Sequence, residues 1–367
     1  MFFMNRRPLM NEKLRVLVLF NDPDYPRGNS QTVVTATGVV QKASTGGGST
    51  AAHLVDTSFE GLETEVEAIC ESLENEGIST WSLNLKNDVD LLVATLQRRD
   101  MDVIFNLVES FHNESEPEMH VAGLYELYKI PYTGASPKAL GNCLDKILTK
   151  QLLKSYGIPV PRYRVIRTLT LQKPIGIPYP LIVKPVHEDA SAGIENDSVV
   201  QNRKQLLERI EYIHRWFKQG ALVEEYIRGR EFNVSVVGNN PMLTMPVSEI
   251  DFSTMPDTLH KIVSYQAKWI PEHAAYKHTV PVCPANISEQ LSHELSRIAI
   301  TCARVMQTRD YARVDMRVTD DHKAYVLEVN PNPDISRDAG FIRATSVYGW
   351  HHGETLKRLI QYAYDRR

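Results

Sequence analysis

The sequence lacks several features that would place it in a class of protein at once. Its 367 residues include only 4 cysteines, which show no C-x-x-C spacing for a metal or redox site. No apolar run approaches a membrane span, and the start, MFFMNRRPLM, has the wrong order for a secretory signal. A net charge of -4 leaves no basic footprint for nucleic acid. We therefore expect a cytoplasmic protein with reduced thiols that binds neither membrane nor nucleic acid.

The sequence also lacks a recognisable phosphate loop near its start. Residues 41–50 are rich in Gly, Ser and Thr, but the Gly-Lys-Ser/Thr ending that would cradle a phosphate is missing. They belong to a longer stretch, residues 21–58, which shows no hydrophobic period. We predict that this stretch is a flexible surface insertion, because long surface loops are thermodynamically tolerable. The role of residues 41–50 is left open.

The first part of the chain shows a regular alternation of strand-like and helix-like segments. Apolar runs bounded by turn residues predict strands, and apolar residues three or four apart predict helices. The expected strands are residues 15–20, 79–84 and 102–106, and the expected helices are 62–75, 88–98 and 118–128. This order is typical of a doubly wound parallel sheet, so we predict a Rossmann-like α/β domain over residues 1–141.

Strands and helices no longer alternate in the rest of the chain. The expected strands are residues 162–166, 180–184, 221–225 and 231–237, and the expected helices are 146–156, 201–218, 288–306 and a last one from about 350. A chain of this length suggests two or three domains. We place a central α+β domain at residues 142–231 and a C-terminal α+β domain at 232–367.

The most informative segment is residues 312–336, ARVDMRVTDDHKAYVLEVNPNPDIS, which reads as two strands joined by a polar turn. Because successive side chains on a strand point to opposite faces, Arg313 and Asp315 share one face and Val314 takes the other. The two polar residues would then lie side by side on the polar face of the hairpin.

The second strand of this hairpin carries Glu328 and Asn330 on one face and Leu327 on the other. Antiparallel pairing would set Asp315 beside Glu328 and Asn330. Acidic residues on a hairpin are usually only solvated. Here two carboxylates, an amide and an arginine occur together, and oxygen ligands suit a hard cation such as Mg²⁺ that also touches phosphates. The hairpin therefore predicts a site for ATP.

Two further strand ends supply groups that fit a nucleotide. Lys184 ends a β-rich run, where a triphosphate could balance its charge. The small, polar residues 187–193 that follow could fold over phosphates through backbone N–H groups. Glu224 and Glu225 end another strand and could accept hydrogen bonds from an adenine amino group and ribose hydroxyls.

Together these segments resemble the ATP-grasp superfamily, and specifically ligases similar to D-alanine–D-alanine ligase. Eight short motifs occur in the order and at about the distances of that family. They are IPYTG at 130–134, LDK at 144–146, VKP at 183–185, VEE at 223–225, GREF at 229–232, QAK at 266–268, ARVD at 312–315 and LEVN at 327–330. The resemblance covers most of the chain from about Phe105.

The resemblance implies an ATP-grasp fold in which ATP lies between the central and C-terminal domains. It implies that Lys146, Lys184 and the loop at Ser191 contact the phosphates. It implies that Glu224 and the neighbouring Glu225 and Ile227 contact the adenine and that Glu231 contacts the ribose. The ligands of Mg²⁺ or Mn²⁺ would be Asp315, Glu328 and Asn330. It also implies that a substrate carboxylate attacks the γ-phosphate to give an acyl phosphate, from which an amine displaces phosphate. Arg313 would stabilise the oxyanion of amide formation, and Lys268 would add positive charge.

The sequence departs from the family where the substrates would bind. The Gly-Gly-x-Ser-x-Glu element of the D-alanine enzymes is absent after the first strand, and Asp334 stands where the family has glycine. A serine that helps to bind the second substrate's carboxylate is also missing. Arg337 or Arg343 could replace it, because a guanidinium binds carboxylate bidentately, although both are equally compatible with a surface position. Asp334 could meet a cationic part of the acceptor.

We therefore predict an ATP-dependent carboxylate–amine ligase that acts on amino acids or small peptides. One alternative is D-alanine–D-alanine ligase proper, and another is an ATP-binding regulatory protein without turnover. Related ligases are often dimers, so a homodimer is compatible with the resemblance. The identity and chirality of the substrates are left open.

Overall fold

The computed structural model describes residues 14–22, 31–34, 40–43, 62–112, 114–169, 174–188 and 190–366. Most of the predicted insertion at 21–58, including most of 41–50, lies outside them. Within the insertion, β2 (Gln31–Val34) and β3 (Val40–Ala43) pair antiparallel, where we had predicted only a loop. Among the described helices, none combines the length and the apolar character needed to cross a bilayer.

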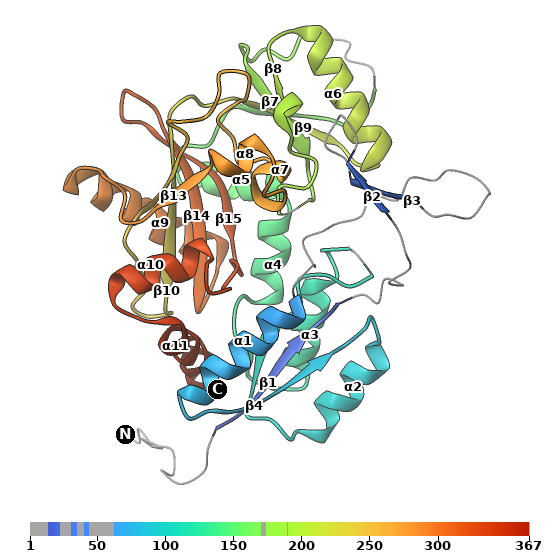
Figure 1. Ribbon diagram of the computed structural model, residues 1–367, viewed down its shortest axis with the longest axis vertical. Coiled ribbons are helices and arrows are strands. Elements are labelled where there is room, and N and C mark those ends of the chain that lie inside the picture. The colour runs from blue at the N-terminus through green and yellow to red at the C-terminus, as the bar shows by residue number, and fades with distance from the viewer. Residues whose placement is uncertain are drawn as a thin grey trace.

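The N-terminal part contains the predicted parallel sheet (Figure 1). Its strand order is β4 (Ser79–Asn84), β1 (Arg15–Phe20), β5 (Val103–Leu107), and both pairings are parallel. Val16 and Val18 enter the hydrophobic core on one face, whereas Leu17 and Leu19 enter the core on the other. Burial on both faces explains why β1 is a continuous apolar run.

Helices cover both faces of this sheet, as the doubly wound prediction requires. The helices α2 (Val89–Arg98), α3 (Glu118–Leu127) and α4 (Pro137–Leu144) pack on the face of Leu17. The predicted start of α2 is fixed by Asp88, whose carboxylate accepts a 2.9 Å hydrogen bond from the Leu91 amide. The sequence had not predicted α4.

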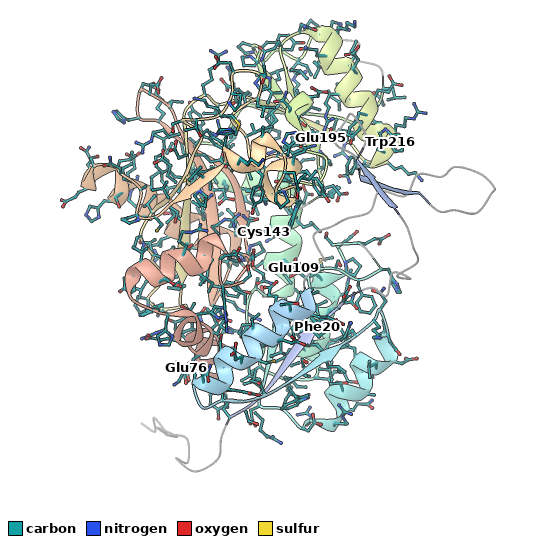
Figure 2. All side chains as sticks on the ribbon, viewed as in Figure 1. Phe20, Glu76, Glu109, Cys143, Glu195 and Trp216 are labelled. Atoms are coloured by element: carbon teal, nitrogen blue, oxygen red, sulfur yellow. The ribbon has the colours of Figure 1, made fainter. Side chains whose placement is uncertain are left out.

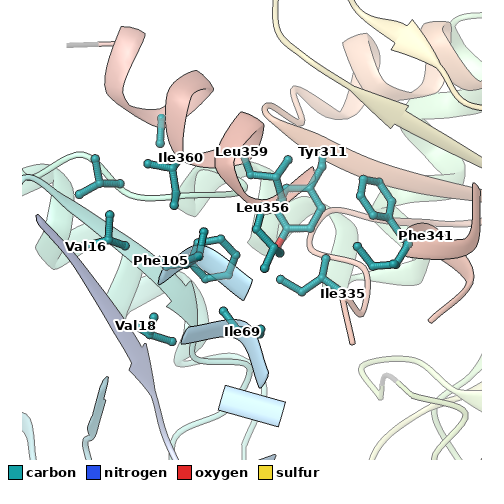
Figure 3. Close-up of a cluster of buried hydrophobic side chains, with 14 of the residues drawn as sticks. Val16, Val18, Ile69, Phe105, Tyr311, Ile335, Phe341, Leu356, Leu359 and Ile360 are labelled. Carbon is teal, nitrogen blue, oxygen red and sulfur yellow. The ribbon is translucent and has the colours of Figure 1, made fainter. Parts of the chain in front are cut away.

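The opposite face is covered by α1 (Leu62–Asn75) together with the last helix of the chain, α11 (His352–Asp365). Figure 3 shows Val16 and Phe105 from the sheet beside Ile360 from α11 in one cluster. Glu76, just past the end of α1, forms an ion pair of 3.1 Å with Lys357 of α11 (Figure 2). The chain thus returns to its first domain at its end, so a hydrophobic core crosses the boundaries that we proposed from sequence.

This packing places Glu65 of α1 in an acidic environment. Burial, together with the charges of Asp334 and Asp338, raises the pKa of Glu65 to about 7. Because the folded pKa lies above the unfolded value of 4.5, the ionised carboxylate destabilises the fold once the pH exceeds 4.5, with the full effect above 7.

We expect Glu65→Gln to increase the free energy of unfolding at pH 8 by about 1–2 kcal/mol and to leave it unchanged at pH 4. Urea unfolding at the two pH values measures this difference. Glu67→Gln, at an exposed position of the same helix, is the matched control and should follow the wild type at both pH values. An equal effect of Glu65→Gln at both pH values would contradict the expectation.

The central part is an antiparallel sheet of order β6 (Tyr163–Ile166), β9 (Ala221–Glu225), β7 (Leu181–Pro185), β8 (Val199–Val200). The amphipathic helix α6 (Arg203–Trp216) packs on it through Leu206, Ile210 and Ile213. The predicted strands and helix are confirmed, with ends shifted by one or two residues. The strand β8 and a short 3-10 turn, η2 (Asn196–Ser198), were not predicted.

The C-terminal sheet is also antiparallel, and its order is β13 (Val280–Val282), β12 (Ser248–Asp251), β10 (Arg230–Val237), β14 (Tyr311–Val318), β15 (Ala324–Asn330), with β11 (Leu243–Thr244) beside β10. The helices α9 (Glu289–Met306) and α5 (Lys146–Ser155) pack on one of its faces. The short helices α7 (Tyr265–Trp269), α8 (Ala274–Lys277) and α10 (Gly340–Tyr348) were not predicted. Residues of the face opposite α9 line a cleft together with residues of the central sheet.

Candidate active site

A cavity of about 420 Å³ opens between the central and C-terminal sheets. It brings together most of the side chains that the sequence singled out, although they come from distant parts of the chain. The predicted site residues that line it are Lys146, Lys184, Ser191, Glu224, Glu225, Ile227, Glu231, Lys268, Arg313, Asp315, Glu328 and Arg343. A cavity of this size is in the range of small-molecule sites.

The hairpin of β14 and β15 has the predicted pairing at the cavity. Asp315 stands opposite Glu328, and Arg313 stands opposite Asn330. Arg313 donates two hydrogen bonds to the Asp315 carboxylate, from Nε and from Nη2, each at 2.8 Å. Asn330 donates to the same carboxylate at 3.0 Å, and Asn233 of the neighbouring strand β10 donates at 2.7 Å. The predicted cluster is therefore present, with Asn233 as a member that the sequence did not indicate.

The prediction for Leu327 was wrong. A bulge interrupts the register after Asp315, so that Met316 pairs with Val326 and Leu327 has no partner on β14. As a result, Leu327 and Glu328 both line the cavity, whereas strict alternation would have turned Leu327 to the opposite face. A bulge of one residue leaves no signal in a period-two pattern.

The two carboxylates of the hairpin differ in their electrostatic surroundings. Burial alone would raise the pKa of Glu328, but the cations Lys268, Lys146 and Lys184 lower it to about 2. Burial raises the pKa of Asp315, against the opposing effect of Arg313. Glu328 is thus ionised and surrounded by cations. The excess of positive charge favours the binding of an anionic ligand, which can bring its own metal ion with it.

The donor set fits a hard cation only in part. Across the described parts of the chain, no group of three or more His, Cys, Asp and Glu side chains could hold a metal ion. The hairpin presents the carboxylates of Asp315 and Glu328 to the cavity, whereas Asn330 binds Asp315 and does not line the cavity, so a cation here needs further oxygens. Mg²⁺ commonly combines one or two carboxylates with substrate phosphates and waters, which matches this set.

Lys184, for which the sequence predicted a triphosphate as a partner, has a carboxylate partner in the protein itself. Its Nζ lies 2.6 Å from Oε2 of Glu224, and Lys150 lies 2.6 Å from Oε1 of the same carboxylate. Glu224 was predicted to contact adenine, but its side chain is 1% exposed and is committed to two ammonium groups. In this position the buried carboxylate balances the charge of two lysines, a role that the sequence did not indicate.

Lys150 was missed by the sequence analysis. A signal was available, because Lys150 lies four residues after Lys146 and so shares its helix face. Lys146 donates to the backbone carbonyl of Glu188, at the base of the predicted phosphate loop. Of the lysines of α5, Lys146 thus lies at the wall of the cleft and Lys150 behind it.

The expected adenine and ribose residues lie at the apolar end of the cavity. Glu225 is bound bidentately by Arg162 at 2.8 and 3.0 Å, and Glu231 is bound by two nitrogens of Arg317 at 2.9 and 2.8 Å. Arg317 also donates to the Ile227 carbonyl at 3.2 Å. The walls of this end are largely branched aliphatic side chains, Ile182, Ile194, Ile227, Ile262 and Leu327. Such a slot suits a planar base.

The predicted phosphate loop is tied to the segment before and within α7. Asp189 of this loop lies outside the described residues. Ser191 donates its hydroxyl to the Val263 carbonyl at 3.0 Å, and the Trp269 indole donates to the Ala190 carbonyl at 3.2 Å. Behind the loop, Arg209 donates to the carboxylate of Glu195 at 2.8 Å (Figure 2). Lys268 of α7 is thereby held over the cavity.

The three predicted substrate residues are separated by the structure. Arg343 lines the cavity and donates to the Asp338 carbonyl at 2.7 Å. Arg337 does not line the cavity and instead binds Glu71 of α1 at 2.6 Å, which contradicts its assignment as a substrate anchor. Asp334 is exposed and caps the Ser336 amide at 2.8 Å, so it does not line the cavity either.

Comparison with known proteins adds independent findings. A family model described as D-ala D-ala ligase C-terminus matches residues 152–361. The Sinorhizobium fredii protein y4sG is 31% identical over 283 residues, which cover 75% of this chain and 81% of that protein. A D-alanine–D-alanine ligase of Carboxydothermus hydrogenoformans is 28% identical over 319 residues, 82% of this chain and 93% of the ligase.

The fold is shared with solved structures as well. The D-alanine–D-alanine ligase from Bacillus anthracis, in complex with ATP, matches with a TM-score of 0.71 over 97% of this chain and 98% of that chain, at 19% identity. The ligase from Coxiella burnetii matches with a TM-score of 0.67. At this level of identity the structural matches establish the fold, and they confirm the architecture predicted from the motifs.

Proposed function

Because the chain belongs to the D-alanine–D-alanine ligase family of ATP-grasp enzymes, we propose that it is an ATP-dependent carboxylate–amine ligase for amino acids or small peptides. The observation that supports this most is the meeting of cations and carboxylates in one cavity. Lys146, Lys184 and Lys268 converge on it from one side, and Glu328 faces them from β15. Phosphoryl transfer needs such positioning and charge neutralisation more than covalent help.

In the first step, an oxygen of the substrate carboxylate bonds to the γ-phosphorus of ATP and ADP leaves. The lysines bind the phosphate oxygens and keep the carboxylate and phosphate from repelling each other. Asp315, Glu328 and Asn330 would hold Mg²⁺ or Mn²⁺, which neutralises phosphate charge when bound. The loop at Ser191 and α7 cover this end of the cavity, which limits hydrolysis of the acyl phosphate.

In the second step, the acceptor nitrogen bonds to the acyl carbon, gives up a proton, and inorganic phosphate leaves. After the nitrogen has bonded and before the phosphate leaves, negative charge develops on the acyl oxygen. Arg313 lies in the cavity wall, where its guanidinium is held rigidly by the Asp315 carboxylate. A fixed cation of this kind stabilises an oxyanion without reorganising during the reaction.

A screen of amino-acid and dipeptide pairs for ADP release, with products identified by mass, tests the proposal. We expect ADP release that requires both a carboxylate and an amine substrate, and a product with the mass of both less one water. Release with D-alanine alone, giving its dipeptide, would identify a D-alanine–D-alanine ligase. ATP binding without ADP release for any pair would overturn the proposal in favour of a regulatory protein.

The structure favours Arg343 over Arg337 as the anchor of the acceptor carboxylate. We expect Arg343→Ala to raise the KM for the acceptor by about tenfold or more, since an ionic hydrogen bond contributes about 1.5–3 kcal/mol. The KM for ATP should change little, because Arg343 is not among the residues assigned to the nucleotide. Steady-state kinetics with the acceptor from the screen measures both constants.

Arg337→Ala is the matched control for this substitution, because Arg337 binds Glu71 and lies off the cavity. Its acceptor KM should equal that of the wild type. If Arg343→Ala leaves the acceptor KM unchanged, or if both variants raise it equally, the assignment of Arg343 is wrong.

A further inference from the structure

Lys150 is a fully buried lysine that none of the steps above uses. Its side chain is 1% exposed, and its Nζ lies 2.6 Å from the Glu224 carboxylate. The same Nζ donates to the backbone carbonyl of Leu327 at 3.1 Å. A buried ammonium needs such partners, because burial lowers its pKa while Glu224 raises it again. Lys150 therefore joins α5 to a strand of each sheet that encloses the cavity.

The first of these contacts determines the charge at the phosphate end. Glu224 is shared between Lys150 and Lys184, each 2.6 Å from one of its oxygens. Two ammonium groups and one carboxylate leave one net positive charge, and Lys184 is the one of the two lysines that lines the cavity. Without Lys150, Glu224 and Lys184 would form a neutral pair, and the attraction for phosphate would fall.

The second contact holds the irregular part of β15. Leu327 is the bulge residue, so its carbonyl has no place in the regular ladder with β14. Lys150 supplies a donor to that carbonyl, and the neighbouring Val326 amide donates to the Pro159 carbonyl at 2.9 Å. Because Glu328 directly follows the bulge residue, a donor that holds the Leu327 carbonyl also restricts the position of Glu328.

We infer that Lys150 is a positioning residue of the nucleotide cleft: it leaves Lys184 with net positive charge by sharing Glu224, and it holds the Leu327 carbonyl, which keeps the adjacent Glu328 in place. This inference rests on the proposed function, because it assumes that the cavity binds ATP. Lys150 itself does not line the cavity, so its effect passes through Lys184 and Glu328.

Binding of the non-hydrolysable analogue AMP-PNP, measured by titration calorimetry with and without Mg²⁺, tests the inference independently of turnover. We expect Lys150→Met to raise the metal-free Kd by about tenfold or more, in line with the loss of a charged hydrogen-bonding partner. The Mg²⁺ concentration needed to enhance binding should also rise. Lys154→Met is the matched control, since Lys154 is exposed one helical turn further along α5, and both quantities should stay at wild-type values.

The double variant Lys150→Met, Glu224→Gln separates the two contacts. It leaves Lys184 without an opposing carboxylate, so metal-free binding should recover toward the wild-type Kd. The Leu327 carbonyl still lacks its donor, so the increased Mg²⁺ requirement should remain. This variant contains no unpaired buried carboxylate, and it keeps the test available if Lys150→Met is too unstable to purify.

A lysine with a purely structural role would lower the melting temperature and leave the Kd of the folded protein unchanged. The inference is therefore overturned if folded Lys150→Met binds AMP-PNP with the wild-type Kd and Mg²⁺ dependence, or if the double variant shows wild-type Mg²⁺ dependence. Failure of the proposed function looks different, because the wild-type protein itself would then not bind AMP-PNP.

Discussion

Replacement of Glu328 by glutamine is expected to lower the rate of ADP release by about 10²–10³-fold, comparable to the loss of a group that stabilises transition-state charge. Glu328 is held as a carboxylate by the surrounding lysines, which lower its pKa to about 2. Glutamine keeps the shape and one oxygen but removes the charge. The cavity would then keep its cations and lose the anion that can bind a metal together with Asp315.

The measurement is ADP release over a range of Mg²⁺ concentrations, because a weakened metal ligand raises the Mg²⁺ concentration required. Asp321→Asn is the matched control, since Asp321 lies in the turn of the same hairpin with a side chain 61% exposed. It should behave as the wild type. Normal turnover by Glu328→Gln at low Mg²⁺ would remove Glu328 from the set of metal ligands.

Replacement of Arg313 by lysine is expected to lower kcat by about 10²–10³-fold, although the charge is conserved. Arg313 binds Asp315 through two nitrogens at 2.8 Å, and this planar arrangement cannot be formed by an ammonium group. Lysine would leave Asp315 less well neutralised and would have no rigid cation to offer the acyl oxygen. The KM for ATP should change much less than kcat, because Arg313 acts after the phosphates are bound.

AMP-PNP binding and single-turnover amide formation show at which step Arg313→Lys acts. AMP-PNP affinity should stay within about threefold of the wild type, and the loss should appear in single-turnover amide formation. Arg297→Lys, at an exposed position of α9, is a control for the substitution itself and should have no effect. A proportional loss in nucleotide affinity and kcat would show that Arg313 supports the fold of the site instead of the second step.

The hairpin shows which structural features a local sequence pattern can predict. Alternation along two strands was enough to predict that Asp315 would stand opposite Glu328, and the structure has this pairing. The prediction failed one residue away, at Leu327, because a bulge depends on what the strand packs against. Here those partners are Lys150 and Pro159, which are far away in the sequence.

Arg337 and Arg343 are a second case in which the local sequence could not predict the position of a side chain. Both are arginines in a polar context six residues apart, and nothing in the sequence separates them. Arg343 is on α10 and lines the cavity. Arg337 instead binds Glu71, because α1 packs against the C-terminal part of the chain. That packing depends on the return of α11 to the first sheet, a contact between opposite ends of the chain.

The sequence by itself determined the chemistry of this protein, because strand alternation, helix periodicity and motif spacing are properties of neighbouring residues. It identified Lys146, Lys184, Asp315 and Glu328 and the order of the sheets that carry them. Only the tertiary structure decided how charges are shared, since the place of Glu224 between Lys150 and Lys184 depends on how α5 and the central sheet meet in space. Electrostatic interactions act through distance in space, and that distance is settled by packing between elements remote in the chain.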